Sequence, residues 1–331
     1  MQATAVVFTA PRTVEVASVQ CPDPGPRDAV IRITHSWISN GTEGSYLRGE
    51  RTDGDTPWHP GDPPPFPVVA GYQKIGVVDW VGADVDDLSI GETVFATIGK
   101  VNGMHHDYGG HLSPSVCPRH EVFKLPPDAD PLAFAGLVLT QVGYNGGMRA
   151  PVDAGSGAVV VGDGLVGQWT AQTLSARGVD VLLVGRHDDR LEYFASWPSA
   201  HVINTHREDW IGAAREHFPN GVDVGVDTVG DVTVMADLEK VARSLGHLVS
   251  MGFYGTEDLL PLQPPRYKEL SIHLVSGWTR ERLLATRKAV AEGRLKTLPL
   301  ISHHYPVERA AEAWELIESR REPVLGVILD W

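Results

Sequence analysis

The stretch G-D-G-L-V-G, from Gly162 to Gly167, constrains the fold more than any other part of the chain. It directly follows the apolar run A-V-V-V and precedes a helix-like segment at 168–177, after which a second apolar run, V-D-V-L-L-V, begins. In a βαβ unit, glycines at this spacing give a tight turn, close approach of the backbone to a pyrophosphate, and close helix-to-strand packing. The sequence therefore predicts a dinucleotide-binding unit. The residues expected to hold the pyrophosphate are Gly162, Gly164, Leu165, Val166 and Gly167.

The pattern around this motif is that of parallel βαβ units. Apolar strands alternate with helical segments between residues 149 and 297, and a helix at 280–295 closes the series. We expect a doubly wound Rossmann domain with a parallel sheet over this range. Its strands are expected at 158–161, 179–184, 222–226, 247–251 and 272–275.

The remaining parts of the chain look different. Residues 1–148 hold short apolar runs between Gly and Pro clusters, a pattern typical of β-strands and loops. Residues 298–331 add a helix at 308–319 and a strand at 324–331, and this tail is expected to pack back onto the β-rich half. The chain has 331 residues, enough for two cores, so we expect an α/β protein of two domains, 149–297 and 1–148 with 298–331.

Composition narrows the choice of partners. A formal net charge of -14 and a pI near 5.4 repel phosphate backbones and anionic membranes. The chain has only 2 cysteines, which excludes a disulfide framework and a zinc site of several thiolates. No apolar run reaches the roughly 18 residues of a membrane span, and no export signal is present. We expect a cytoplasmic protein with a small-molecule substrate and no nucleic-acid or membrane partner.

The end of the second strand bears on the choice of cofactor. Sites that prefer NAD place Asp or Glu there, roughly 20 residues beyond the glycines, where it binds the ribose hydroxyls. This chain has Gly185, Arg186 and His187 instead. Arg186 can form a charge-assisted fork with a 2′-phosphate worth roughly 1.5–3 kcal/mol, so Gly185 and Arg186 predict NADP(H) over NAD(H). Asp188 and Asp189 oppose this, and the alternative is that Arg186 is a solvated charge and both cofactors bind.

The order of these parts resembles the medium-chain dehydrogenase/reductase superfamily over nearly the whole chain. Supporting pieces are the central G-D-G-L-V-G, P-V-V-A-G-Y-Q-K-I-G-V-V at 67–78, I-G-E-T-V-F at 90–95 and R-A-A-E-A-W-E-L-I at 309–317. The resemblance implies a GroES-like catalytic domain beside the Rossmann domain, an NAD(P)-dependent oxidoreductase and a homodimer. It also implies cofactor contacts from Gly252 and from Thr140, which matches a residue that touches the nicotinamide.

The zinc-dependent members of this superfamily carry I-C-G-T-D and P-G-H-E motifs, and this chain departs from both. The loop W-I-S-N-G-T-E at 37–43 has Ser39 or Asn40 at the cysteine position, depending on the alignment. G-Y-Q has Tyr72 and Gln73 where His and Glu stand, and the third ligand falls near Gly136. The resemblance therefore implies a member without zinc.

One other segment could offer metal ligands. G-M-H-H-D-Y-G-G-H contains His105, His106, Asp107 and His111. Adjacent histidines rarely point the same way, so we expect a polar loop rather than a metal site.

Without a metal, an oxygen that gains charge needs hydroxyl or amide donors, each worth roughly 3–4 kcal/mol in a dry site. The candidates are Thr42 and Tyr72, supported by the amide of Gln73 or Asn40. Thr42 matches the hydroxyl that relays a proton in zinc-dependent members, and Glu43 matches the acid beside it. We predict catalytic roles for Thr42, Tyr72, Glu43 and Gln73 in hydride transfer. The alternatives are that Tyr72 only packs the cleft and that Glu43 binds backbone amides.

Three functions fit this sequence. The loops resemble the polyol and secondary-alcohol branches, bacteriochlorophyllide dehydrogenases included, which favours an alcohol/ketone substrate. Trp37, Tyr46, Trp58 and Tyr144 lie in or beside the loops and favour a bulky or cyclic one. The alternative, which for any single one of them is the expected case, is an aromatic side chain buried in the core. Lack of zinc is typical of quinone and enoyl reductases, which reduce carbon–carbon double bonds. The third alternative is a non-catalytic NADPH-binding protein.

Overall fold

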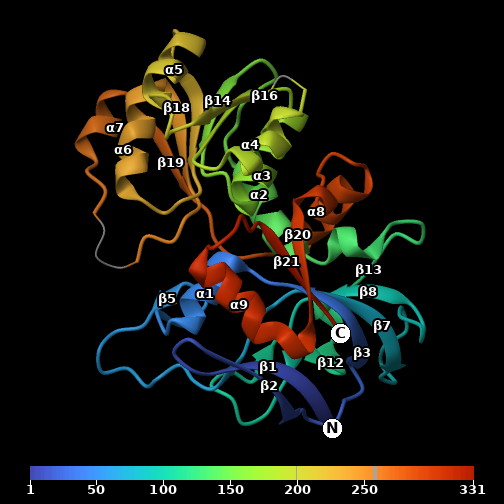
Figure 1. Cartoon of the computed structure of the whole chain (residues 1–331). Helices are drawn as coiled ribbons and strands as arrows, with labels where there is room; N and C mark the ends of the chain where they lie inside the picture. Colours follow the sequence, from blue (N-terminus) through green and yellow to red (C-terminus); the bar gives the residue numbers. More distant parts are fainter. Residues whose placement is uncertain (199, 256–258) are drawn as a thin grey trace. The chain divides into compact units, whose positions relative to one another are not determined.

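The structure is a computed structural model that describes residues 1–198, 200–255 and 259–331 (Figure 1). They form two compact units, Met1–Val138 with Thr297–Trp331, and Leu139–Lys296. The expected α/β class is confirmed, because one unit holds a parallel sheet and the other holds β-rich sheets of mixed direction. This division falls after residues 138 and 296. The domain limits expected from the sequence, after residues 148 and 297, remain a prediction.

Two larger sheets and two short ladders build the first unit. One sheet contains β11, β1 and β2 with β6 on β1, and the other runs β13-β8-β7-β3-β21-β20 with β12 on β3. β21 comes from the far end of the sequence and pairs with β3, Ile328 opposite Trp37, so the C-terminal return completes this sheet. The strands are β1 Gln2–Ala10, β2 Thr13–Gln20, β3 Asp28–Trp37, β4 Arg51–Asp53, β5 Thr56–Pro57, β6 Val68–Val69, β7 Lys74–Val81, β8 Thr93–Ala96, β9 Gly99–Lys100, β10 Tyr108–Gly109, β11 Leu112–Ser113, β12 Ser115–Pro118, β13 Val122–Lys124, β20 Ile301–Pro306 and β21 Gly326–Asp330.

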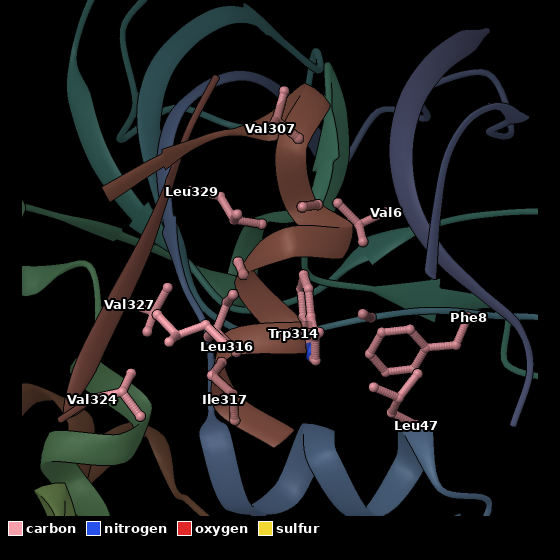
Figure 2. Packing of buried hydrophobic residues seen from close by; sticks show 14 of the residues in the cluster. Val6, Phe8, Leu47, Val307, Trp314, Leu316, Ile317, Val324, Val327 and Leu329 are labelled. Carbon is pink, nitrogen blue, oxygen red and sulfur yellow. The ribbon is translucent and has the colours of Figure 1, made fainter. Parts of the chain in front are cut away.

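Helix α9, Ala310–Ser319, lies at the centre of a hydrophobic core in this unit. Figure 2 shows it between Phe8 of β1 on one side and Leu329 of β21 on the other, with Leu47 of α1 at its end. Trp314 of α9 meets Phe8 edge to face, with ring centroids 5.4 Å apart. Burying each large apolar side chain stabilises the fold by roughly 1.5–3 kcal/mol, so this core holds α1 in place.

The segment 37–43 was expected to be a loop, but most of it is not. Strand β3 ends at residue 37, and helix α1, Asn40–Leu47, begins at residue 40. Its sequence N-G-T-E-G-S-Y-L has two glycines, each costing about 1 kcal/mol relative to alanine in a helix interior. Tertiary contacts override this weak propensity. Leu47 is buried in the α9 core, and the Glu43 carboxylate accepts a hydrogen bond from the Ser39 amide at 2.8 Å.

The second unit is built on one parallel sheet of order β16-β15-β14-β17-β18-β19. Numbered from β14 this is 3-2-1-4-5-6, the doubly wound Rossmann order. β14, G-A-V-V-V, is buried at every position, as expected for a central parallel strand. The five expected strands are present, and β16 is an additional one. Its short sequence A-H-V-I-N lies at the sheet edge and lacks a continuous apolar run.

The helices around this sheet are short. None of those in the described ranges is long and apolar enough to cross a membrane. Helix α2, Leu137–Arg149, begins in the first unit and continues into the second. The elements of the second unit are β14 Gly157–Val161, α3 Leu165–Ala176, β15 Asp180–Gly185, α4 Asp188–Ala195, β16 Ala200–Asn204, α5 Trp210–His217, β17 Val222–Asp227, α6 Val232–Val241, β18 Ala242–Ser250, α7 Gln263–Tyr267, β19 Ser271–Leu274 and α8 Arg280–Ala291.

Candidate active site

The glycine turn lies between β14 and α3, at the carboxyl end of the parallel sheet. Gly162 has φ +117, and a Cβ on Gly167 would stand 1.8 Å from the Gly162 carbonyl oxygen. Gly164, the N-cap of α3, has no heavy atom within 4 Å of its Cβ position, so its face is open. Leu165 and Val166 form the first turn of α3, whose amides have no partner within the helix. Open backbone and a helix N-terminus fit a pyrophosphate.

Asp163, between these glycines, fixes the turn that follows β15. Its carboxylate accepts the backbone amides of Arg186 at 2.7 Å and His187 at 2.9 Å. A Cβ on Gly185 would lie 2.4 Å from the same carboxylate, which explains why glycine ends β15. Burial raises the pKa of Asp163, but the amides of Arg186 and His187 and the His187 ring outweigh it and hold that pKa below its usual range. The Asp163 carboxylate is therefore charged, and it already accepts hydrogen bonds from the protein backbone.

The Arg186 side chain itself is exposed, and no carboxylate in the described ranges pairs with it. The nearby Asp188, which opposed the prediction of NADP(H), is paired with Arg207 and accepts Asn204 at 2.7 Å. Its charge is thus partly compensated within the protein. Asp189 is exposed on the first turn of α4.

The turn after β17 is organised by Asp227, which the sequence pattern did not single out. Asp227 is buried and accepts the backbone amides of Val229 at 2.7 Å and Gly230 at 3.1 Å, and also the Tyr254 hydroxyl. Burial raises the pKa of Asp227 above its usual range. Gly252, predicted to contact the cofactor, packs here: a Cβ on it would meet the Gly230 nitrogen at 2.0 Å. The signal in the sequence was an acid directly at the end of an apolar strand.

In the first unit, the start of α1 meets the turn before β7. The Tyr72 hydroxyl donates a hydrogen bond to Ser39 Oγ at 2.6 Å. Thr42 hydrogen-bonds to the same Tyr72 hydroxyl. Burial is the main cause that raises the pKa of Tyr72, ahead of the opposing hydrogen bond with Ser39, and the result lies well above the usual range. Tyr72 is therefore a protonated donor at neutral pH, connected to two further hydroxyls.

Behind this hydroxyl cluster is a buried polar chain. Glu43 Oε1 accepts the Ser39 amide at 2.8 Å, and Glu43 Oε2 lies 2.9 Å from His111 Nε2. His111 Nδ1 lies 2.8 Å from Ser36 Oγ, which accepts the Trp331 indole at 2.8 Å. All groups are satisfied if Ser36 donates to Nδ1 and Nε2 carries the proton to Glu43. Glu43 therefore positions Ser39, and His111, expected in a polar loop, is a buried part of the site.

The residues at the three expected ligand positions do not fit a zinc ion. Ser39 and Tyr72 bond each other directly, and neither offers the thiolate or imidazole that zinc selects. Asn40, the other residue aligned with the cysteine, turns away and donates to the Leu325 carbonyl at 2.7 Å. At Gly136 a Cβ would stand 2.8 Å from the Trp37 ring, which leaves no room for a ligand side chain.

The remaining predicted residues have supporting positions. Gln73 is buried, and its amide donates to the Trp37 carbonyl at 3.2 Å, where β3 ends. Thr140 is buried on α2. Trp37 is completely buried and packs under Gly136, so for this residue the alternative of a core aromatic holds. Tyr46 is partly exposed and donates to the Gly54 carbonyl at 3.3 Å.

The histidine-rich segment divides between two surroundings. The rings of His105 and His106 meet edge to face with centroids 4.7 Å apart, and His106 stacks on Tyr108 at 5.0 Å. His111 is fully buried with Glu43. Within the described part of the chain, these residues form no group of three ligand atoms close enough to hold one metal ion.

Comparison with known proteins finds a family model that matches part of the chain and relatives that match the whole chain. The model of zinc-binding dehydrogenases matches residues 166–290. A 2-desacetyl-2-hydroxyethyl bacteriochlorophyllide A dehydrogenase of Cereibacter sphaeroides is 27% identical, over 100% of this chain and 99% of the relative.

Two solved structures share the fold. An Escherichia coli oxidoreductase/dehydrogenase of unknown specificity, involved in membrane biogenesis, matches with a TM-score of 0.88 and 19% identity, over 100% of this chain and 99% of the other. A Sinorhizobium meliloti protein described as a zinc-binding dehydrogenase, solved with NADP, has a TM-score of 0.84 and 20% identity, over 100% of both chains. With the Rossmann order and the glycine turn, these findings place the family. The chain belongs to the medium-chain dehydrogenase/reductase superfamily of NAD(P)-dependent oxidoreductases.

Proposed function

We propose that this protein is a zinc-independent, NADP(H)-dependent oxidoreductase that interconverts an alcohol and a ketone, with hydroxyl groups in place of a metal. The observation that carries the proposal is the direct 2.6 Å hydrogen bond between Ser39 and Tyr72. Tyr72 matches one ligand position of zinc-dependent members, and Ser39 matches another in the alignment that places it, rather than Asn40, at the cysteine. Gly136, whose Cβ would collide with Trp37, supports the same proposal at the third position.

The chemistry assigned to these residues is stabilisation and protonation of one oxygen. A bound NADP(H) supplies or accepts the hydride at the carbon. In the reducing direction, Tyr72 donates its hydrogen bond, and then its proton, to the substrate oxygen. The hydroxyls of Ser39 and Thr42 can then donate to the Tyr72 oxygen, which stabilises the phenolate that remains. Glu43 holds the Ser39 backbone, so it is a positioning residue.

The preference for NADP(H) over NAD(H) rests on Arg186. Its exposed guanidinium has no carboxylate partner in the described part of the chain, and Gly185 offers no acid to a ribose. We expect Arg186→Ala to raise the Michaelis constant for NADPH about 10-fold or more, the equivalent of one charge-assisted fork, and to leave that for NADH unchanged. Arg215→Ala, exposed on α5, is the matched control. A wild-type protein that binds NADH more tightly than NADPH would contradict this part.

The substrate class is proposed as a bulky or cyclic secondary alcohol and its ketone. The relative from Cereibacter sphaeroides is, by its name, a dehydrogenase of a hydroxyethyl bacteriochlorophyllide. That name supports both the carbinol chemistry and the size of the substrate. Soluble small-molecule chemistry, rather than a nucleic-acid or membrane partner, agrees with the net charge of -14. A homodimer and a cytoplasmic location remain part of the proposal.

The deciding experiment follows deuterium from NADPH labelled at C4 into products. The substrates are a cyclic ketone and the enone with the same carbon skeleton. Label on a carbinol carbon supports the proposed alcohol/ketone chemistry. Label at the carbon beta to a retained carbonyl would replace it with the quinone/enoyl reductase alternative. Tight NADPH binding without oxidation by either substrate class would favour the non-catalytic alternative.

A further inference from the structure

At the amino end of the parallel sheet, three side chains from three different elements converge. Asp180 begins β15, His201 lies on the edge strand β16, and His217 ends α5. The His217 Nε2 atom is 2.9 Å from Asp180 Oδ2, and the His201 Nε2 atom is 3.5 Å from Asp180 Oδ1. The two imidazole rings are also close, with centroids 4.1 Å apart. We call these three residues the amino-edge cluster.

The hydrogen bonds of this cluster are incomplete. Asp180 Oδ1 is shielded from solvent and has no hydrogen-bond partner, although His201 Nε2 lies 3.5 Å from it. A shielded carboxylate oxygen without a partner costs free energy, so such atoms in proteins usually have a donor or a cation. Only one of the two histidines, His217, forms a bond of normal length with the carboxylate. The second nitrogen and the second oxygen are left facing each other.

The geometry of the three atoms is close to that of a metal site. One ligand atom from each residue lies within 4.8 Å of the other two. With metal-to-ligand distances of about 2.0–2.1 Å, the ligand atoms of a tetrahedral zinc ion are roughly 3.3 Å apart. The two histidine-to-carboxylate separations, 2.9 Å from His217 to Oδ2 and 3.5 Å from His201 to Oδ1, lie on either side of that value, each measured to its own carboxylate oxygen. Since all three side chains are partly exposed, small rotations bring them to it.

The donor set also selects the class of ion. Two imidazoles and one carboxylate suit Zn²⁺, Co²⁺, Ni²⁺ or Cu²⁺, whereas Mg²⁺ and Ca²⁺ require oxygen ligands. Exposure leaves a fourth position for water. Exposure alone also permits an ordinary surface ion pair, but such a pair needs only one histidine, and here both face the same carboxylate.

We propose that Asp180, His201 and His217 bind one divalent transition-metal ion of the zinc class. The site lies at the start of β15, whereas Gly185 ends that strand beside the glycine turn, so the metal is at the opposite end of the sheet from the cofactor motif. Its role is structural: it connects the edge strand β16 and helix α5 to β15. Metal binding therefore stabilises the second unit and is independent of the hydride chemistry proposed above.

The test uses the tag-free full-length protein, stripped with a chelator and titrated with ZnCl2 and, for its visible spectrum, with CoCl2. We expect one equivalent of Zn²⁺ per chain, a rise in Tm, and the absorption of Co²⁺ coordinated by imidazole nitrogen. The double variant His201→Ala/His217→Ala should lose the bound equivalent. Asp180→Asn, which keeps the shape of the side chain, should weaken binding at least about tenfold, since even outer partners of metal ligands change affinity about 10–100-fold.

The matched control is His59→Ala/His120→Ala, which removes two exposed histidines that each lie beside a carboxylate, Asp62 and Glu121. It should bind Zn²⁺ as the wild type does. NADPH binding, measured by fluorescence, confirms that every variant is folded and should be the same with and without metal. The proposal is overturned if the wild-type protein takes up no Zn²⁺ at micromolar concentrations, or if the amino-edge variants retain the equivalent.

Discussion

At the scale of single residues, Tyr72 carries most of the proposed chemistry. Its hydroxyl is placed by Ser39 and Thr42, and its raised pKa keeps the proton available. A phenol in such surroundings is a donor rather than a base. The sequence indicated Tyr72 and Thr42 as candidates, but it could not show that Ser39 completes the cluster, because the two stretches are 33 residues apart.

Replacing Tyr72 by Phe removes the donor and keeps the ring. We expect turnover to fall about tenfold or more, because one general acid contributes typically 10²–10⁴-fold. Steady-state kinetics with NADPH and the ketone measures this. Tyr46→Phe, another partly buried tyrosine whose hydroxyl bonds only a carbonyl of a loop, should keep wild-type turnover. If the Tyr72 and Tyr46 variants are equally active, Tyr72 has no catalytic role.

Glu43 illustrates a residue whose function is to hold others. Replacing it by Ala leaves the His111 ring nitrogen and the Ser39 amide without a partner in a buried place. We expect a loss of about 1–3 kcal/mol in the free energy of unfolding, measured by urea denaturation. Glu50→Ala, which removes an exposed carboxylate paired with Arg48 just after α1, should cost less than 1 kcal/mol, about the median for surface pairs. Equal losses in both variants would contradict the structural role of Glu43.

At the scale of elements, the parallel sheet could be read from the sequence, and helix α1 could not. Long apolar runs such as V-D-V-L-L-V leave few alternatives to a buried strand, so five of the strands follow from pattern alone. The N-G-T-E-G-S-Y-L helix has no such pattern, and it exists because Leu47 and Glu43 are held by distant residues. The edge strand β16 was missed because only one of its side chains is fully buried.

The glycine turn allows a test in which two similar substitutions have different effects. Gly167→Ala places a Cβ 1.8 Å from the Gly162 carbonyl, so we expect it to lower both stability and NADPH affinity. Gly164→Ala has a φ of -73 and open space, so stability should be unchanged. Its methyl group covers the face assigned to the pyrophosphate, and NADPH affinity alone should fall. Thermal unfolding and fluorescence titration separate the two effects, and a stable Gly167→Ala protein would refute the packing argument.

At the scale of the whole molecule, the ionisable groups predict lower stability in alkali. Burial raises the pKa of Tyr46 to about 12, and it also raises the pKa of Tyr72, Tyr108 and Tyr254 and of the two thiols, Cys21 and Cys117. The unfolded chain releases these protons from about pH 8.5 for Cys and about pH 10 for Tyr, while the folded chain retains them. The contribution of these groups to the free energy of unfolding is fully present below the pKa values of the unfolded chain, and it is lost as the pH rises toward the raised pKa values of the folded chain.

The buried amine of Lys74 acts in the opposite direction. Burial lowers the pKa of Lys74, so the contribution of this residue to the free energy of unfolding becomes more favourable as pH rises. Because the Tyr and Cys groups outnumber Lys74 among the described residues that titrate in this range, we expect the urea midpoint to fall steadily between about pH 8.5 and pH 10.5. Replacing Tyr46 by Phe should reduce the slope at the upper end of the range. A midpoint that stays constant or rises would show that these pKa values are not raised.

The contact between Gly136 and Trp37 also determines how this catalyst could be redesigned. A cysteine at position 39 and a histidine at position 72 would supply two metal ligands, but a third ligand at 136 would collide with the indole at 2.8 Å. That indole is fully buried where β3 ends, and its own removal would leave a void in the sheet. The substitution at 136 is therefore harmful unless Trp37 changes with it. Conversion to a metalloenzyme requires at least these two positions to be exchanged together.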